Sequence, residues 1–482
     1  MTEAPVRPIR TAAITNLGCK VNQSEMEGAA RRLRELGIHV TDGDHPADLV
    51  LVNTCTVTAE ADAKSRHAVR RARRTSPDAQ VVVTGCSVQV GREAFAAVDG
   101  AARLVDNRSK DALLAEIDAL IGVPLQGETD RRALARALPT LSGVDIEGIV
   151  DGRASVERTR AFVKVQDGCS FFCTYCIIPA ARGPESSLAP EAVLADVRRA
   201  LAAGHREIVL TGINIGTYDG GWSERGFRGA HSRSVLTLAG IVRRILEETD
   251  TERIRVSSIE PQHVDDDLLR VWADGAPRTL PHLHLPLQSG DDGVLRRMGR
   301  RYRSGDYATI VGRVREALPG VAVHADAIVG FPTEDEAAWA RSLDFIRSLD
   351  LAGLHVFRYS ARPGTAATRM TGQVDEPTKK RRAAKLLAVG ADARARWAAA
   401  HVGRTASVLF ESVLPDGRWV GHASDHTLVT APPPPTDRHD LENAIAAVAV
   451  ESVDPAALDR VVGRIVDLSP PRTPLGGPAL AH

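Results

Sequence analysis

The most informative stretch of the chain is Asp167-Gly168-Cys169-Ser170-Phe171-Phe172-Cys173-Thr174-Tyr175-Cys176. Its three thiols follow the spacing C-x3-C-x2-C, so one short loop can direct three sulfur atoms at a common point. Three thiolates are one fewer than the four that usually hold an iron–sulfur cluster, which would leave one iron of a four-iron cluster open to a small molecule. The alternatives are a disulfide and a zinc knuckle, although zinc prefers a fourth ligand that the segment lacks.

This loop resembles the signature of the radical S-adenosylmethionine (SAM) superfamily, in which an aromatic residue precedes the third cysteine, as Tyr175 does here. The resemblance implies that Cys169, Cys173 and Cys176 are the catalytic ligands of a [4Fe-4S] cluster. It also implies that the open iron binds the amino and carboxylate groups of SAM. Cleavage of SAM by one electron would then release a 5′-deoxyadenosyl radical.

Composition sets the general class of the protein. The 482 residues suffice for about three domains, and an apolar content of 43% is ordinary for a folded chain. The sequence has no signal-peptide pattern and no apolar run of about 18 residues, so we expect a cytoplasmic protein. In a reducing compartment, six cysteines indicate metal binding or catalysis rather than disulfides. The net charge is zero, and we interpret the basic runs at 70–74, 296–303 and 379–385 as solvated helix faces.

Strand–helix units are predicted for a first domain at residues 9–122. The strands are expected at 11–19, 48–55 and 80–86, and the helices at 22–36 and 59–74. Each strand ends at a cysteine, namely Cys19, Cys55 or Cys86. Since right-handed crossovers bring the carboxyl ends of parallel strands to one edge of a sheet, these cysteines should converge on a second three-cysteine site. The alternative is three small buried residues without a ligand.

Three segments, at 16–25, 52–58 and 84–86, resemble the amino-terminal domain of the methylthiotransferases. These radical SAM enzymes insert a methylthio group into an unactivated C–H bond. The form Cys19-Lys20-Val21-Asn22-Gln23 is similar to the bacterial branch that acts on N6-threonylcarbamoyladenosine beside the tRNA anticodon. The resemblance implies a second [4Fe-4S] cluster on Cys19, Cys55 and Cys86, attack at carbon 2 of the adenine, a tRNA partner and a low-potential electron donor. It does not identify the sulfur donor.

A linker at 123–155 should lead to a radical SAM domain at 156–401. Its strands are expected at 161–166, 206–214, 253–261, 282–290, 321–332 and 353–361. Six β/α units are too few to close an eight-stranded barrel. The fold class is therefore α/β, with a parallel sheet domain followed by an open, partial (β/α)6 barrel whose site lies at the carboxyl ends of its strands.

Polar residues and glycines gather at these strand ends, where ordinary turn chemistry would also account for them. The family resemblance implies instead that they line the SAM pocket. The residues concerned are Tyr175, Thr211, Gly212, Asn214, Glu260, Gln288 and Gly330. His282 and His284 alternate on one strand and raise a metal pair as an alternative, which we disfavour because the iron sites already supply the metal chemistry.

The chain departs from the family pattern at three places. The usual basic-rich run after the cluster loop reads Arg182-Gly183-Pro184-Glu185-Ser186-Ser187, which we expect to reduce positive charge at the mouth of the site. The usual Phe-Pro-Tyr-Ser reads Phe357-Arg358-Tyr359-Ser360, which we expect to return a cation. Residues 216–234, rich in glycine, serine and arginine, should form an extended loop at the active face.

The carboxyl-terminal part begins with a basic helix expected at 375–401. Short strands are then predicted at 405–413, 418–423, 427–430, 444–451 and 460–468, a pattern typical of a small OB-like β-barrel. Its position resembles the TRAM RNA-binding module, here at 402–470, and a tail is expected at 471–482.

Three functions therefore compete. The first is methylthiolation of N6-threonylcarbamoyladenosine in tRNA. The second is the same chemistry on isopentenyladenosine in tRNA or on a ribosomal-protein aspartate. The third is a non-enzymatic iron–sulfur electron carrier or RNA-binding protein, against which the open coordination and the polar strand ends weigh.

Overall fold

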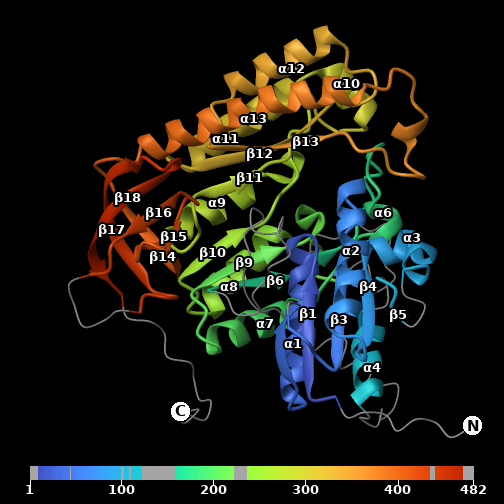
Figure 1. Cartoon of the computed structure of the whole chain (residues 1–482). Coiled ribbons are helices and arrows are strands. Elements are labelled where there is room, and N and C mark those ends of the chain that lie inside the picture. Colours follow the sequence, from blue (N-terminus) through green and yellow to red (C-terminus); the bar gives the residue numbers. More distant parts are fainter. Residues whose placement is uncertain are drawn as a thin grey trace, which may run out of the picture. The chain divides into compact units, whose positions relative to one another are not determined.

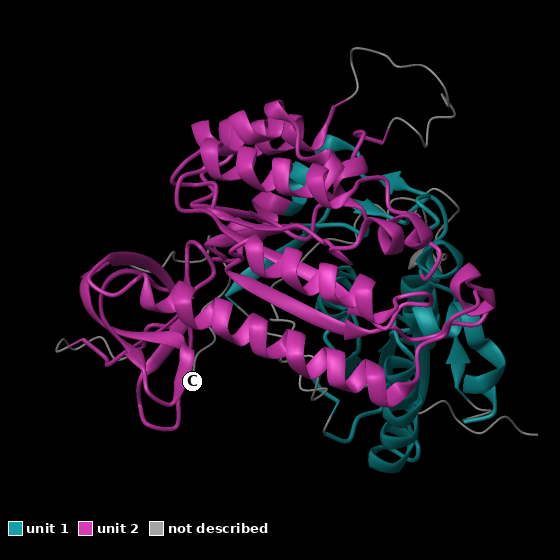
Figure 2. Ribbon diagram, turned by 90° about the horizontal axis from the view of Figure 1, so that it is seen from above, with its two compact units in different colours: residues 1–172, 176–196, 211–213 teal, residues 173–175, 197–210, 214–482 magenta. Residues whose placement is uncertain are grey.

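The computed structural model describes residues 9–43, 45–98, 102–107, 110–121, 159–221, 236–434 and 440–469 (Figure 1). The predicted linker at 123–155, most of the predicted loop at 216–234 and the predicted tail lie outside these ranges. The chain divides into two compact units, which Figure 2 colours separately. Unit 1 comprises residues 1–172, 176–196 and 211–213, and unit 2 comprises residues 173–175, 197–210 and 214–482. No helix in the described ranges combines the length and apolar character needed to cross a membrane.

Unit 1 is built on a five-stranded, all-parallel sheet. The strand order is β2 (His39–Asp42), β1 (Thr11–Asn16), β3 (Leu49–Thr54), β4 (Gln80–Gly85) and β5 (Arg103–Leu104). The three predicted strands form its centre. Sequence analysis missed the edge strand β2 because it has no buried apolar run.

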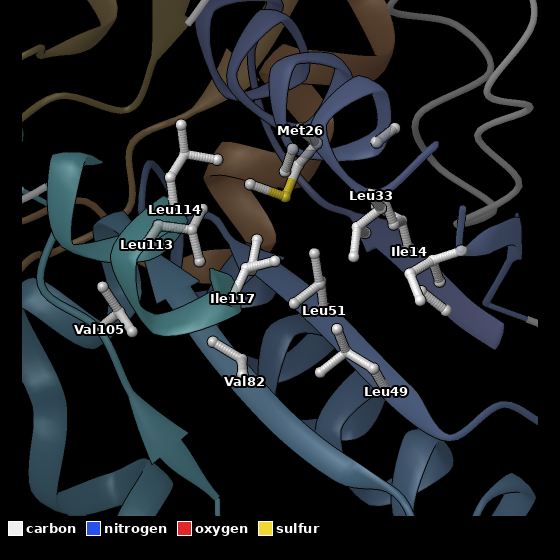
Figure 3. Close-up of a cluster of buried hydrophobic side chains, with 14 residues drawn as sticks. Ile14, Met26, Leu33, Leu49, Leu51, Val82, Val105, Leu113, Leu114 and Ile117 are labelled. Atoms are coloured by element: carbon white, nitrogen blue, oxygen red, sulfur yellow. The ribbon is translucent and has the colours of Figure 1, made fainter. Parts of the chain in front are cut away.

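Helices cover both faces of this sheet. Helices α1 (Lys20–Glu35) and α4 (Lys110–Ile121) pack on one face, where Ile14, Leu49, Leu51 and Val82 point into a shared core (Figure 3). Helices α2 (Ala59–Thr75) and α3 (Cys86–Ala96) pack on the other, against the alternate strand residues. Strands buried on both faces read as continuous apolar runs, which is why β3 and β4 were easy to predict.

The rest of unit 1 carries the cysteine loop. Strand β6 (Arg160–Lys164) is followed by a short antiparallel pair, β7 (Gln166–Asp167) and β8 (Ser186–Ser187). The cysteine loop and α6 (Ile178–Arg182) lie between β7 and β8 in the chain. This pair closes the loop at its base and was not predicted.

Unit 2 contains the larger part of the β/α region. Strands β9 (Glu207–Thr211) and β10 (Arg253–Val256) are parallel, as are β11 (His282–His284), β12 (Ala322–Val329) and β13 (Gly353–Arg358). The helices are α7 (Pro190–Ala202), α8 (Leu238–Glu248), α9 (Asp266–Asp274), α10 (Asp292–Met298), α11 (Ser304–Ala317) and α12 (Glu336–Ser348), with short 3-10 turns η2 (Ile215–Thr217), η4 (Pro261–His263) and η5 (Ala366–Arg369). Every predicted strand forms, but each ends earlier than predicted because its polar or glycine-rich end leaves the ladder to become a loop.

A closed five-stranded β-barrel ends the described chain, after α13 (Glu376–Ala399). Its strand order is β14 (Thr405–Val413), β15 (Trp419–Ala423), β16 (Leu428–Ala431), β18 (Ala457–Leu468) and β17 (Ile445–Asp454). The predicted small barrel is thus confirmed. The interpretation of 379–385 as a solvated face was wrong in part, since Arg382 is buried and pairs with Glu334 at 2.8 Å.

Candidate functional site

Cys19, Cys55 and Cys86 lie at the carboxyl ends of three neighbouring strands of unit 1. Cys19 caps the start of α1, Cys55 directly follows β3, and Cys86 begins α3. A Cβ atom placed on Gly18 would be 3.3 Å from Cys55 Cβ, so the turn after β1 runs close beside Cys55. The topology therefore gathers the three cysteines at one edge of the sheet, while their role as cluster ligands stays a prediction.

Burial alters the acidity of one of these thiols. Removal from water raises the pKa of Cys55 to about 12. A hydrogen bond from the Val57 N–H lowers this pKa, but its effect is smaller than that of burial. The neighbouring Cys86 and Cys19 sulfurs raise the pKa further, because adjacent thiolates repel each other. Iron and zinc bind the thiolate form, so a positively charged metal group would displace these protons. The donor set, three cysteine sulfurs at one edge of the sheet, fits an iron–sulfur cluster.

Two asparagine side chains contact these sulfurs. Asn107 Nδ2 lies 3.4 Å from Cys86 Sγ and also donates to Ala181 O at 3.1 Å. Cys19 Sγ lies 3.6 Å from Asn22 Oδ1, and Asn22 Nδ2 donates to Leu17 O and Thr54 O. N–H donors to sulfur tune the potential of iron–sulfur groups. Sequence analysis missed Asn107, because no recognisable motif links position 107 with Cys86.

A buried ion network lies beside the same edge of unit 1. Arg182 Nη1 lies 3.1 Å from Glu25 Oε1 and 2.8 Å from Asp167 Oδ1, and Arg182 Nη2 also donates to Asn22 Oδ1. Lys164 Nζ completes the network at 3.5 Å from Glu25 and 3.4 Å from Asp167. The Arg182 side chain is 1% exposed. The charge of Arg182 is therefore neutralised inside unit 1, and the expected reduction of positive charge at the mouth of the site stays a prediction.

The pKa values of this network favour its charged form. Burial alone would lower the pKa of Arg182, but Asp167 and Glu25 hold that pKa well above the usual value. Burial would raise the pKa of Asp167, but Arg182 and Lys164 lower it overall. Asn22 and Glu25 sit on α1 just after Cys19, and Asp167 stands two residues before Cys169. The network thus ties the start of the cysteine loop to the helix that Cys19 caps.

The cysteine loop begins with a close backbone approach. Gly168 has φ +69°, and a Cβ atom there would lie 1.9 Å from Pro184 O, so only glycine fits. Gln166 Nε2 donates to Asp167 O and Gly168 O, both at 2.9 Å, and the Cys169 N–H donates to Gly183 O at 3.1 Å. These contacts fix the start of the cysteine loop, up to Cys169, within unit 1.

The middle of the loop belongs to unit 2. Arg300 Nη1 lies 3.5 Å from Cys173 Sγ and 3.4 Å from the Tyr175 hydroxyl, and Arg300 Nη2 pairs with Glu260. The Tyr175 ring packs edge-on against Phe331, with ring centroids 6.4 Å apart. Burial raises the pKa of Glu260, while Arg300 opposes that rise. Arg300 falls in a run interpreted as a solvated helix face; its side chain is 3% exposed, so that interpretation was wrong for this residue.

The other predicted SAM contacts lie at strand ends as expected, and their roles stay predictions. In unit 1, Thr211 ends β9 and accepts the Val165 N–H at 2.9 Å, and Gly212 follows it. In unit 2, Asn214 is buried where η2 begins. Gln288 adopts φ +71°, and its N–H donates to Asp326 O at 2.7 Å.

Gly330, in unit 2, forms a backbone hydrogen bond and is closely approached by a neighbouring side chain. Its N–H donates to Glu334 Oε2 at 2.6 Å, and a Cβ atom at this position would lie 2.3 Å from Lys379 Cγ. Burial raises the pKa of Glu334 to about 7, although the Gly330 N–H and Arg382 both lower it. Within unit 2, Arg300 therefore contacts both Tyr175 and Glu260. Tyr175 also packs on Phe331, the residue that follows Gly330.

Comparison with known proteins identifies the class. Residues 11–105 match the model described as "Uncharacterized protein family UPF0004", and residues 163–346 match the radical SAM superfamily. The threonylcarbamoyladenosine tRNA methylthiotransferase MtaB of Bacillus subtilis is 35% identical over 87% of this chain and 90% of its own length. The MtaB of Thermotoga maritima is 31% identical over 86% of this chain and 89% of its own.

Other relatives are named for a different nucleoside. The tRNA-2-methylthio-N(6)-dimethylallyladenosine synthase of Erythrobacter litoralis is 31% identical over 86% of this chain and 90% of its own length. Among solved structures, the radical SAM methyltransferase TsrM of Kitasatospora setae aligns with a TM-score of 0.51 and 15% identity, covering 74% of this chain and 77% of that one. This last likeness concerns the fold alone.

The class is that of radical SAM enzymes, whose cofactors are SAM and a [4Fe-4S] cluster. The chain belongs to the tRNA methylthiotransferase family, and its relatives indicate a SAM-dependent tRNA-modifying transferase. The family assignment removes the non-enzymatic alternative.

Proposed function

We propose that this protein transfers a methylthio group to carbon 2 of N6-threonylcarbamoyladenosine, next to the anticodon of tRNA. Two observations together support the proposal. The chain contains two sets of three cysteines, and it aligns with most of the length of relatives that are named for this nucleoside. Because tRNA is the substrate, we place the reaction in the cytoplasm. It needs a low-potential electron donor and a sulfur source, neither of which we identify.

We assign Cys169, Cys173 and Cys176 to one [4Fe-4S] cluster and Cys19, Cys55 and Cys86 to a second. When bound, the first group supplies the electron for SAM cleavage and the second presents the sulfur that is transferred. The predicted SAM contacts are Tyr175, Thr211, Gly212, Asn214, Glu260, Gln288 and Gly330. The hard chemistry belongs to the cofactors, so the protein's task is to bind, orient and exclude water.

Particular residues of this chain serve that task. Arg300 holds Glu260 and the Tyr175 hydroxyl in place and puts a fixed positive charge 3.5 Å from Cys173 Sγ. In unit 1, Arg182 keeps Asp167 charged, and Asp167 Oδ1 accepts the Gly168 N–H at 2.8 Å, which fixes the start of the loop.

Mass spectrometry of tRNA nucleosides tests the substrate. Cells that lack the protein should accumulate N6-threonylcarbamoyladenosine without its methylthio group, and the wild-type chain should restore the modification. Restoration should fail with Cys173→Ala. If the methylthio group were instead lost from isopentenyladenosine, the substrate assignment would be wrong. Methylthiolation of isopentenyladenosine is the second candidate function, and the Erythrobacter litoralis relative, named for N(6)-dimethylallyladenosine, supports it.

We further propose that the β-barrel contributes tRNA affinity. The exposed Arg404 and Arg464 lie on or beside its strands and are candidates for binding phosphates. Changing both to Ala should weaken tRNA binding and reduce the slope of its salt dependence by about one for each phosphate that is no longer neutralised. The control is Arg198→Ala, an exposed cation on α7. If the barrel variant and the control showed equal salt dependence, Arg404 and Arg464 would not be contacts to tRNA phosphates.

A further inference from the structure

Three donor side chains from three neighbouring strands meet in unit 2. Strands β11, β12 and β13 are parallel, with Asp326 paired opposite His355 and His284 paired opposite His324. Side chains two residues apart on a strand share a face, so His284, Asp326 and His355 project on the same side of this sheet. On β12 the neighbours Ala325 and Ala327 are buried while Asp326 is partly exposed, with 18% of its side chain accessible.

The donor atoms are close enough to share one ion. His284 Nε2 lies 2.8 Å from Asp326 Oδ1, and His355 Nδ1 lies 3.3 Å from the same oxygen. One ligand atom from each of the three residues falls within 4.8 Å of the others. Donors that bind one zinc ion at tetrahedral angles stand about 3.4 Å apart, so only small rotamer changes are needed.

We propose that His284, Asp326 and His355 form a mononuclear site for a divalent transition metal, zinc above all, separate from both cysteine sets. Two imidazoles and one carboxylate are a common ligand set for zinc, and they leave further positions for water or an anionic oxygen. The backbone of the site is fixed, because Asp326 O accepts the Gln288 N–H at 2.7 Å. The inference stands on these three strands and does not depend on the proposed substrate.

The ligand set differs from the pair that the sequence raised. His282 shares a strand with His284, but its ring stacks on His426 and meets His324 edge-on, each at 4.8 Å between centroids. His282 therefore belongs to an aromatic stack, and the metal ligands come from different strands.

Zinc binding to the full-length, cluster-loaded protein tests the proposal. After anaerobic reconstitution, incubation with zinc and gel filtration, plasma mass spectrometry should find about one zinc per chain. Asp326→Asn, His284→Asn and His355→Asn should each reduce zinc to background. The matched control is His401→Asn, because His401 also pairs with a buried aspartate, Asp425, but no third ligand joins them among the described residues. That control should keep the zinc.

A second measurement keeps the test decisive if a variant fails to fold. In the wild-type protein, zinc should protect His284 and His355, but not exposed histidines, from diethyl pyrocarbonate, as read by peptide mass spectrometry. X-ray absorption at the cobalt edge, after substitution of cobalt for zinc, should show nitrogen and oxygen neighbours and no sulfur neighbours. Equal zinc in wild type and Asp326→Asn, equal modification with and without zinc, or sulfur neighbours around cobalt would overturn the proposal.

Discussion

The two three-cysteine sets differ in how the chain brings their ligands together. Cys169, Cys173 and Cys176 lie within eight residues of one loop, whereas Cys19, Cys55 and Cys86 come from the ends of three strands. A loop motif survives any change that leaves the loop intact. A site assembled from strand ends exists only when the sheet has folded. The comparison teaches that the first set can be recognised from spacing alone, and the second only from topology.

Removing the loop cysteines should have the largest effect. Anaerobically reconstituted wild-type protein should hold about eight irons, four for each set. The triple change of Cys169, Cys173 and Cys176 to Ala should halve the iron and abolish formation of 5′-deoxyadenosine, because no electron reaches SAM. Iron analysis and chromatography of the reaction products measure both. Residual SAM cleavage by the triple variant would refute the assignment of the loop.

One cysteine of the strand-end set, Cys55, should also be less reactive as a free thiol. With a pKa of about 12 in place of 9.0, Cys55 holds about 1,000-fold less thiolate at pH 8. In cluster-free, folded protein, iodoacetamide should therefore label Cys55 far more slowly than in the same protein denatured. Peptide mass spectrometry over a time course gives the two rates. Comparable rates would mean that burial does not suppress this thiolate.

Arg182 tests whether the strand-end set and the base of the loop share one scaffold. Arg182→Met leaves Glu25 and Asp167 without their guanidinium, which should cost unit 1 about 3–5 kcal/mol. Hydrogen exchange of peptides from α1 and β3 reports this loss. The control is Arg198→Met, whose ion pair with Glu248 is exposed and should contribute less than about 1 kcal/mol. Equal effects of the two changes would show that the network is dispensable.

The pH dependence of the same network should be a smaller effect. The folded pKa of Asp167 is lowered from 3.8, so its ionisation stabilises the fold above that value and the contribution is lost as the pH falls below it. The difference in unfolding free energy between wild type and Asp167→Asn should therefore shrink in acid. Chemical denaturation at several pH values measures it. A difference that grows as the pH falls would have the wrong sign for this account.

Much of the fold of unit 1 was predictable, because its central strands β3 and β4 are apolar runs bounded by turn residues. The edge strand β2 was missed because it lacks such a run, and the β7–β8 pair was missed because two-residue strands carry no pattern. The cysteines were found from spacing and strand ends. Arg182, Arg300 and Asn107 were missed, since nothing local separates a buried cation or amide from a solvated one.

The histidine cluster shows the same limit. Inspection of one strand paired His282 with His284 and gave little reason to expect a metal. The register of three strands instead joins His284 with Asp326 and His355, which lie 42 and 71 positions later in the chain. Only the parallel pairing of β11, β12 and β13 connects residues so far apart.

If the two cysteine sets do different chemistry, one variant should separate the two reactions. Cys19, Cys55 and Cys86 should be changed together to Ala, and 5′-deoxyadenosine and methylthiolated nucleoside should be assayed in the same reaction with tRNA. The account predicts that the variant keeps about half the iron and still forms 5′-deoxyadenosine, but transfers no methylthio group. Methylthiolated nucleoside from this variant, or loss of 5′-deoxyadenosine from a folded variant that still carries the loop cluster, would contradict it.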